Sequence, residues 1–186
     1  MPAGRIHDQI TLRCLPFVAG LTLLISRSAN LTLIVCGGFL FSGLMFGPDL
    51  DIHSCQFNRW GLLKWIWLPY QKSLRHRSFL SHGPVVGTML RLVYLGTWMI
   101  LLVGLGLGIA YSFGGVIWSW QEIVAMVKTS FKKHAVEWLV LYGGLELGAL
   151  SHSLSDWAGS VYKTYFRLVI PPTVKQPSKA HGRRRS

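Results

Sequence analysis

Histidine and aspartate gather in four short runs of this sequence. The runs are His7-Asp8, Asp49, Asp51 and His53 in GPDLDIH, His76 and His82 in HRSFLSHG, and His152 and Asp156 in SHSLSD. They contain five of the seven histidines and four of the seven acidic residues of the chain. Imidazole together with carboxylate is the ligand set of zinc, manganese or iron sites. The four runs therefore predict a metal site, if the fold brings them together.

The spacing within two runs is compatible with shared ligands. On a helix, His152 and Asp156 would lie on one face, about 6 Å apart. His76 and His82 are six residues apart and fit no single helix face. We therefore expect a turn at 78–81 to bring these two histidines together.

Each run taken alone also has a plainer interpretation. In the run at 49–53, an extended chain would point Asp49, Asp51 and His53 the same way, whereas a helical turn would align only Asp49 with His53. The same run could also be a polar loop that binds no metal. His76 stands between two arginines, as in a patch for lipid phosphates. The pair at 152–156 could be a helix cap or an ion pair. His7 and Asp8 lie near a chain end, where residues often lack fixed structure. The metal site rests on all four runs converging.

We expect one or two divalent ions, with zinc foremost and manganese or iron as alternatives. The expected ligands are His7, Asp49, His53, His76, His82, His152 and Asp156. Asp51, as a spare carboxylate, would orient a bound water or take its proton, and Arg77 would hold a phosphate oxygen bidentately. Cys55 is a lesser ligand candidate, and Glu146 would support a ligand or pair with a neighbouring helix.

Long apolar segments must position these runs. The 186 residues are 51% hydrophobic and 14% charged, as is typical of helical membrane proteins. No charge interrupts 28–48 or 92–120, and each is longer than the roughly 20 apolar residues that a spanning helix needs. We expect an all-α fold with four membrane spans, at about 12–26, 30–47, 90–114 and 136–154. The first is short, and the last contains two glutamates.

The remaining segments complete a single helical domain at 1–168. The segment 48–84 is expected to be a long loop that carries ligands, since long loops are usually functional. Tryptophans at headgroup level would anchor a helix at 118–134 in the membrane interface. A basic tail without fixed structure is expected at 169–186.

Basic residues outnumber acidic ones by 19 to 7, which gives a net charge of +12. They lie between and beyond the apolar segments, which favours anionic lipids over nucleic acid as the partner. Four spans would place fifteen of the nineteen on the side of the N-terminus, the long loop and the tail. The positive-inside rule makes that side cytoplasmic, and all four runs fall on it. His134 on the other side and His181 in the tail are left out of the site.

The sequence HRSFLSHG resembles the His-Arg-Ser/Gly-x-x-(Thr/Ser)-His-(Ser/Gly) signature of the YdjM-like inner-membrane, metal-dependent hydrolases. A closer similarity is to a mainly cyanobacterial branch, the DUF2227 metal-binding proteins of unknown function. An N-terminal His, a PDxD run, an HR-x4-H box and a late His-x3-Asp occur there in the order seen here at 7, 48–51, 76–82 and 152–156. The resemblance extends to about Phe166. It implies metal binding more firmly than catalysis, in a bacterial inner membrane or a thylakoid membrane.

The expected function is metal-assisted hydrolysis of a phosphate ester or lipid-like substrate at the cytoplasmic membrane face. A non-catalytic metal sensor, carrier or scaffold is the alternative, and it would need a closed coordination shell. A metal-free enzyme of the phosphatidate-phosphatase type matches less well, because no Arg lies six residues before His152 and no Arg-Pro occurs. An open pocket with Arg77 aimed at the ligands would favour hydrolysis, whereas a sealed cluster would favour the alternative.

Overall fold

The computed structural model describes residues 4–115 and 119–169, and every regular element in these ranges is a helix. The elements are α1 (Gly4–Ser26), α2 (Ala29–Leu44), the 3-10 helix η1 (Pro48–Asp51), α3 (Cys55–Asn58), the 3-10 helix η2 (Gly61–Trp67), α4 (Leu68–Ser73), α5 (Phe79–His82), α6 (Val86–Ser112), α7 (Trp120–Lys133) and α8 (Ala135–Val169). The expected all-α class is confirmed for this part of the chain. The tail expected at 169–186 lies outside it, except for Val169 at the end of α8.

Among the described residues, three helices are long and apolar enough to cross a membrane. They are Ile6–Ser26 in α1, Ala29–Asp51 through α2 and η1, and Val86–Ser112 in α6. The prediction of four such spans is wrong by one, because the helix at 136–154 is not among them. Its two glutamates and its serines and histidine lower its hydropathy. The sidedness inferred from four crossings stays a prediction.

Glycines allow α2 and α8 to pack closely. A methyl group at Gly38 would lie 2.9 Å from the carbonyl oxygen of Leu141, and one at Gly148 would lie 2.8 Å from the backbone nitrogen of Gly43. Small residues of this kind let two helix backbones approach each other in apolar surroundings. The contacts advance in the same direction along both helices. The two helices therefore run parallel and reach the segment after Gly47 together.

We expect Gly148→Ala to lower the thermal unfolding midpoint of the detergent-purified protein. The added methyl group would lie 2.8 Å from both Gly43 N and Ser42 Cβ, and overpacking of this kind costs about 1–3 kcal/mol. Gly143→Ala on the same helix is the matched control, because a methyl group there meets nothing within 4 Å. The control should keep or raise the midpoint, since alanine favours a helix. Equal midpoints for the two variants would contradict the close α2–α8 contact.

The segment 48–82, called the helical cluster below, is a packed unit rather than the loop expected from the sequence. Its short helices surround a buried core of Phe46, Leu50, Phe57, Ile66, Trp67, Tyr70 and Leu145. The fully buried ring of Trp67 makes edge contacts with the rings of Trp60 and Tyr70, at centroid distances of 5.1 and 5.6 Å. Helices of four to seven residues are too short to show helical periodicity. For this reason the sequence pattern suggested a loop.

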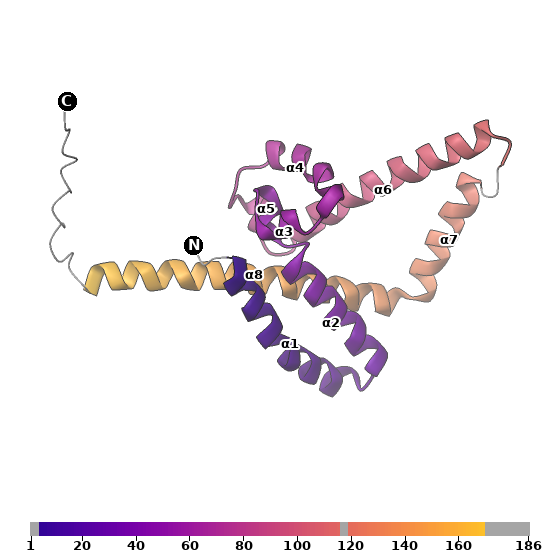
Figure 1. The fold of residues 1–186 in the computed structure, drawn as a ribbon. Helices are drawn as coiled ribbons and strands as arrows, with labels where there is room; N and C mark the ends of the chain where they lie inside the picture. Colours follow the sequence, from indigo (N-terminus) through magenta and orange to yellow (C-terminus); the bar gives the residue numbers. More distant parts are fainter. Residues whose placement is uncertain (1–3, 116–118, 170–186) are drawn as a thin grey trace, which may run out of the picture.

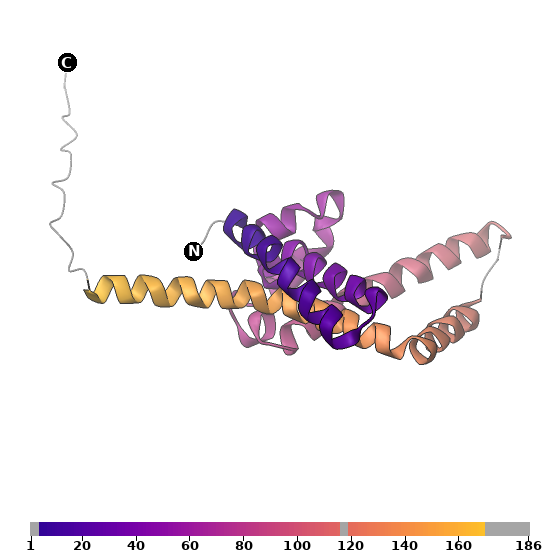
Figure 2. The ribbon, with the colours of Figure 1, turned by 90° about the horizontal axis from the view of Figure 1, so that it is seen from below.

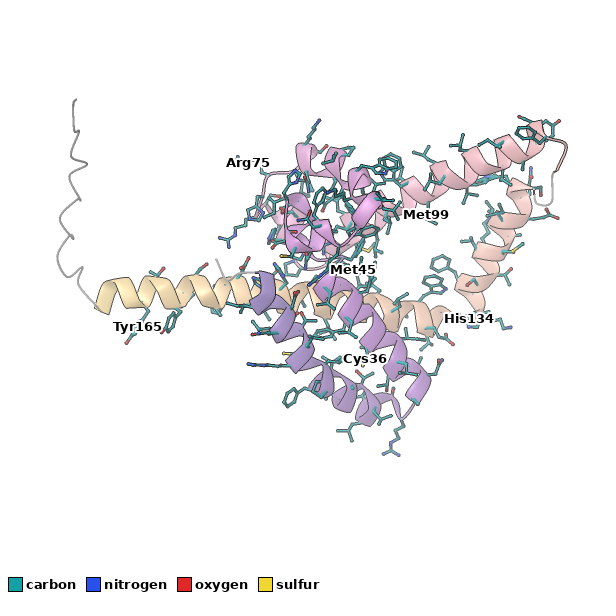
Figure 3. The ribbon with its side chains drawn as sticks, viewed as in Figure 1. Cys36, Met45, Arg75, Met99, His134 and Tyr165 are labelled. Atoms are coloured by element: carbon teal, nitrogen blue, oxygen red, sulfur yellow. The ribbon has the colours of Figure 1, made fainter. Side chains whose placement is uncertain are left out.

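Helix α6 leaves the helical cluster and diverges from α2 and α8, as Figures 1 and 2 show. α7 returns from the far end of α6 to the start of α8. The helix expected at 118–134 is therefore present, as Trp120–Lys133, although Trp118 lies outside the described residues. His134 lies at the corner between α7 and α8, away from the helical cluster (Figure 3), and its Nδ1 is 3.5 Å from Glu137 Oε1. This position agrees with its exclusion from the site.

Candidate metal centre

The four His/Asp runs come together where α1, α8 and the helical cluster meet the end of α2. Asp49 and Asp51 lie in η1, whose 3-10 turn replaces the extended chain considered for this run. α5 provides the turn expected at 78–81, and the ring centroids of His76 and His82 lie 5.2 Å apart. The expected pairing of these two histidines is confirmed.

The first ligand group joins the start of α1 to the middle of α8. His7, His152 and Asp156 each offer one ligand atom within 4.8 Å of the others. The two imidazole rings stack at a centroid distance of 3.9 Å, and the two histidines are only 5% and 3% exposed. His7 Nε2 lies 3.3 Å from Asp156 Oδ1. His7 is thus held against α8, despite its place near a chain end.

The second ligand group joins η1 to the segment 76–82. Asp49, His76 and His82 again offer one atom each within 4.8 Å of one another. Asp49 Oδ1 lies 3.7 Å from His82 Nε2, while Asp49 Oδ2 lies 3.1 Å from His152 Nε2 in the first group. The Asp49 carboxylate therefore lies between the two groups and faces both.

Hydrogen bonds orient two of the histidines with Nε2 toward the centre. His76 Nδ1 donates to Asp51 Oδ1 at 2.8 Å, a carboxylate–histidine pairing that fixes the ring and places the proton on Nδ1. Ser155 Oγ donates to the carbonyl oxygen of His152 at 2.8 Å and accepts from His7 Nδ1 at 2.6 Å. In both rings the Nε2 lone pair is left available to a metal ion.

The unpaired atoms of the centre test whether these residues fit a metal. Among the described residues, Nε2 of His76, of His82 and of His152 are buried without a hydrogen-bond partner. An unpaired buried polar atom costs about 1–3 kcal/mol, and native structures contain few of them. Lone pairs of imidazole and carboxylate cannot hydrogen bond to one another without a proton, but a divalent cation satisfies both. The donor set therefore fits a transition metal.

An open cavity of about 270 Å³ adjoins the first ligand group. Its wall includes Asp49 and the two stacked histidines, His7 and His152. His53 and Cys55 contribute to the same wall, and both are exposed. His7, Asp49 and His152 therefore border a space large enough to hold water, while Nε2 of His152 itself is buried.

His53 and Cys55 belong to neither ligand group. The ring of His53 packs edge-on against Phe57 at a centroid distance of 4.7 Å, so it faces the cavity rather than the ligands. The reason is the backbone: η1 ends at Asp51, and Ile52 is extended, which takes the next side chain out of line with Asp49.

The two residues expected to act on substrate lie away from the cavity. The side chain of Asp51 is fully buried, bonded to His76 and 3.7 Å from His82 Nδ1. Arg77 does point at a ligand group, but its Nη2 lies 3.3 Å from Asp156 Oδ2. Asp51 therefore orients histidines, and Arg77 neutralises a carboxylate.

Sequence reasoning did not assign a role to Arg91, which holds the segment bearing His82. Arg91 on α6 is only 1% exposed and donates to the carbonyl oxygen of Ser81 at 2.9 Å and to Thr88 Oγ1 at 3.0 Å. Ser81 Oγ in turn lies 2.8 Å from His82 Nδ1. A buried arginine inside an apolar segment was the available signal, because such charges are usually functional or paired.

Helix α8 also fixes this segment at two strained positions. Arg77 and Val85 have φ angles of 61° and 64°, which residues other than glycine rarely adopt. Asp156 contacts the Arg77 guanidinium, and the Glu146 carboxylate accepts from Val85 N at 2.8 Å. Such conformations persist where the surroundings enforce them. Glu146 was expected to support a ligand or pair with a neighbouring helix; it accepts from the backbone of Val85, the residue that precedes α6.

An ion pair ties the start of α1 to the helical cluster. The guanidinium of Arg59 donates to both carboxylate oxygens of Asp8 and, at 2.7 Å, to the carbonyl oxygen of Leu44. The hydrogen bonds to Asp8 raise the pKa of Arg59 further above its usual value. The Asp8 carboxylate, which lines the cavity next to His7, is therefore already paired with Arg59.

Comparisons with known proteins bear on this centre. The model of a family described as "Uncharacterized metal-binding protein (DUF2227)" matches residues 2–166. An "Uncharacterized protein" of Aquifex aeolicus (strain VF5) is 41% identical over 59 residues, which cover 31% of this chain. The match spans 41% of that relative's own length. No solved structure matches the chain.

Proposed function

Because the chain belongs to the DUF2227 family of uncharacterized metal-binding proteins, we propose that its His/Asp centre binds a divalent metal and hydrolyses a phosphate ester or lipid-like substrate. One observation carries this proposal: the unpaired Nε2 of His152 belongs to a residue in the wall of the open cavity. His7, Asp49 and His152 would hold the ion beside this cavity, from which water could reach it, and catalytic metal sites need such access. The similarity of 76–83 to the YdjM-like signature points to the same reaction class.

The residues of the chain would hold and orient the reacting groups. A divalent ion supplies a water of lowered pKa and polarises a phosphoryl or carbonyl oxygen. Asp51 keeps the proton of His76 on Nδ1, and Ser155 does the same for His7. His53, exposed on the cavity wall, is placed to exchange a proton with a substrate in the cavity.

We further propose that the three apolar helices, with the part of α8 that packs along α2, lie in a bacterial inner membrane or a thylakoid membrane. The return of the chain through α8 would place the whole centre at the cytoplasmic face. The helical cluster beside the centre carries Arg59, Lys64, Lys72, Arg75 and Arg77. Arg75 lies at the outer edge of this cluster, away from α8 (Figure 3). Basic residues favour the cytoplasmic side and anionic lipid headgroups.

A non-catalytic metal-binding role is the second candidate, and one observation favours it. Three of the four carboxylates at the centre already have a partner: Asp8 contacts Arg59, Asp51 contacts His76 and Asp156 contacts Arg77. The fourth, Asp49, is a proposed ligand. A hydrolase usually keeps one carboxylate or imidazole for proton transfer. If His53 does not serve, the centre would bind metal without turnover.

An assay on protein loaded with Mn²⁺ or Zn²⁺ separates the two candidates. We expect hydrolysis of p-nitrophenyl phosphate, bis-p-nitrophenyl phosphate or phosphatidic acid in anionic liposomes. His152→Ala should reduce the rate by more than the roughly 10–100-fold that loss of an outer partner costs. His134→Ala, at the distant α7–α8 corner, is the control and should retain the rate. Stoichiometric metal without turnover of any ester would favour the non-catalytic role.

A further inference from the structure

The ligand atoms of the centre form two sets that come from different parts of the fold. The first set depends on the docking of α1 against α8, and the second on the fold of the segment 76–82 beside η1. Each set contains three residues whose ligand atoms lie within 4.8 Å of one another. Each set is therefore compact enough to hold an ion of its own.

One residue connects the two sets. The two oxygens of Asp49 face different histidines, with Oδ2 at 3.1 Å from His152 Nε2 and Oδ1 at 3.7 Å from His82 Nε2. A carboxylate that turns one oxygen to each of two ligand sets has the arrangement of a bridging ligand. Such ligands are suited to two-metal centres.

A single ion would leave part of the centre unsatisfied. An ion bound by the first set and Asp49 would have four ligand residues, none of them His76 or His82. Nε2 of His76 and Nε2 of His82 would then remain buried without partners. An ion in the second set alone would leave the buried Nε2 of His152 unpaired. Two ions satisfy all of these atoms.

The charge at the centre agrees with this count. Asp49, Asp51 and Asp156 bring three carboxylates together. Arg77 is the guanidinium paired with one of them. A second divalent ion would offset negative charge that one ion leaves in largely buried surroundings.

We propose that the centre holds two divalent ions, one in each ligand set, bridged by the carboxylate of Asp49. This inference rests on the proposed metal binding and specifies the ion count and the bridging residue. His7, His152 and Asp156 complete one site, and His76 and His82 complete the other.

Counting ions in variants of each set tests the proposal. After loading with Mn²⁺ and desalting, the detergent-purified wild type should retain two equivalents by elemental analysis. His7→Ala and His76→Ala should each retain one, because each removes a ligand from one set. His53→Ala, a histidine beside the centre but in neither set, should retain two. Circular dichroism and size exclusion would show that all variants are folded.

Electron paramagnetic resonance of bound Mn²⁺ tests the bridge. The wild type should show an exchange-coupled signal, and His7→Ala and His76→Ala the six-line signal of an isolated ion. Asp49→Asn should lose the coupling, because an amide offers one oxygen acceptor in place of two. Asp8→Asn, at a carboxylate that pairs with Arg59 and belongs to neither ligand set, should preserve the coupling and serves as the matched control.

Three results would overturn the proposal: one equivalent in the folded wild type, loss of both ions from either single-set variant, or unchanged coupling in Asp49→Asn. The same data keep it separate from the hydrolase proposal. Two coupled ions without turnover would support the two-ion centre and contradict the hydrolase proposal. One ion with turnover would support the hydrolase proposal and contradict the two-ion centre.

Discussion

Replacing His82 and His152 together with alanine is expected to strip the purified protein of metal. The double variant removes one imidazole from each ligand group, so each group keeps only two of its three residues. Both lost nitrogens are buried atoms without partners among the described residues, so their removal breaks no protein hydrogen bond made by Nε2. Elemental analysis of the wild type and the variant, prepared side by side, measures the effect. We expect bound zinc, manganese or iron in the wild type and background levels in the variant.

A matched double variant controls for the loss of two histidines. His53→Ala with His134→Ala removes one imidazole beside the centre and one at the α7–α8 corner, neither of them in a ligand group. It should retain the wild-type metal content. Both double variants should remain in the membrane fraction, because none of the four side chains belongs to an apolar surface. Stoichiometric metal in His82→Ala/His152→Ala would show that the ligands are other residues.

Removing the metal is expected to lower the thermal stability of the wild type substantially. A metal at 1,000 times its dissociation constant stabilises the folded state by about 4 kcal/mol. For a chain of this size that is a shift of the unfolding midpoint of roughly 8–16 °C. The effect should be large here because the ions would tie α1, α8, η1 and the segment 76–82 to one another. Tryptophan fluorescence, with eight tryptophans in the chain, follows unfolding in EDTA and in Mn²⁺.

The double variant His82→Ala/His152→Ala distinguishes specific binding from a general effect of divalent ions. Its midpoint should be the same in EDTA and in Mn²⁺. A shift as large as that of the wild type would place the stabilising ion elsewhere, for example among lipid or detergent headgroups. An unchanged wild-type midpoint would contradict a centre that links the four segments.

The long helices could be predicted from the sequence because apolar runs report directly on membrane-length helices. The expected spans at 30–47 and 90–114 appear as α2 and α6, and the expected span at 12–26 is the C-terminal part of α1. The helix at 136–154 was misjudged as a fourth apolar span. The acidic Glu146 is accommodated in this helix because its carboxylate accepts a hydrogen bond from Val85 N. Sequence alone cannot show such a partner.

The candidate ligands could be found from residue type, but their roles could not. All four aspartates and five of the seven histidines of the chain lie in the four runs, so their grouping was informative without any coordinates. The direction of each side chain depends on backbone detail. The 3-10 turn of η1 turns Asp49 and Asp51 toward the histidines and leaves His53 on the cavity wall. The pairing of Arg77 with Asp156 spans 79 residues and has no local sequence signal.

The distance along the chain between the two ligand groups sets an order of assembly during protein synthesis. Asp49, His76 and His82 have all been made once residue 82 is reached, whereas His7 must wait for a partner 148 residues further on, at Ser155. At about 5–20 residues per second, the first ligand group is complete roughly 4–15 s after the second. A nascent chain therefore completes one set of ligands while α8 is still unmade. Ribosome stalling after α6 would yield a protein able to capture one ion but not the other.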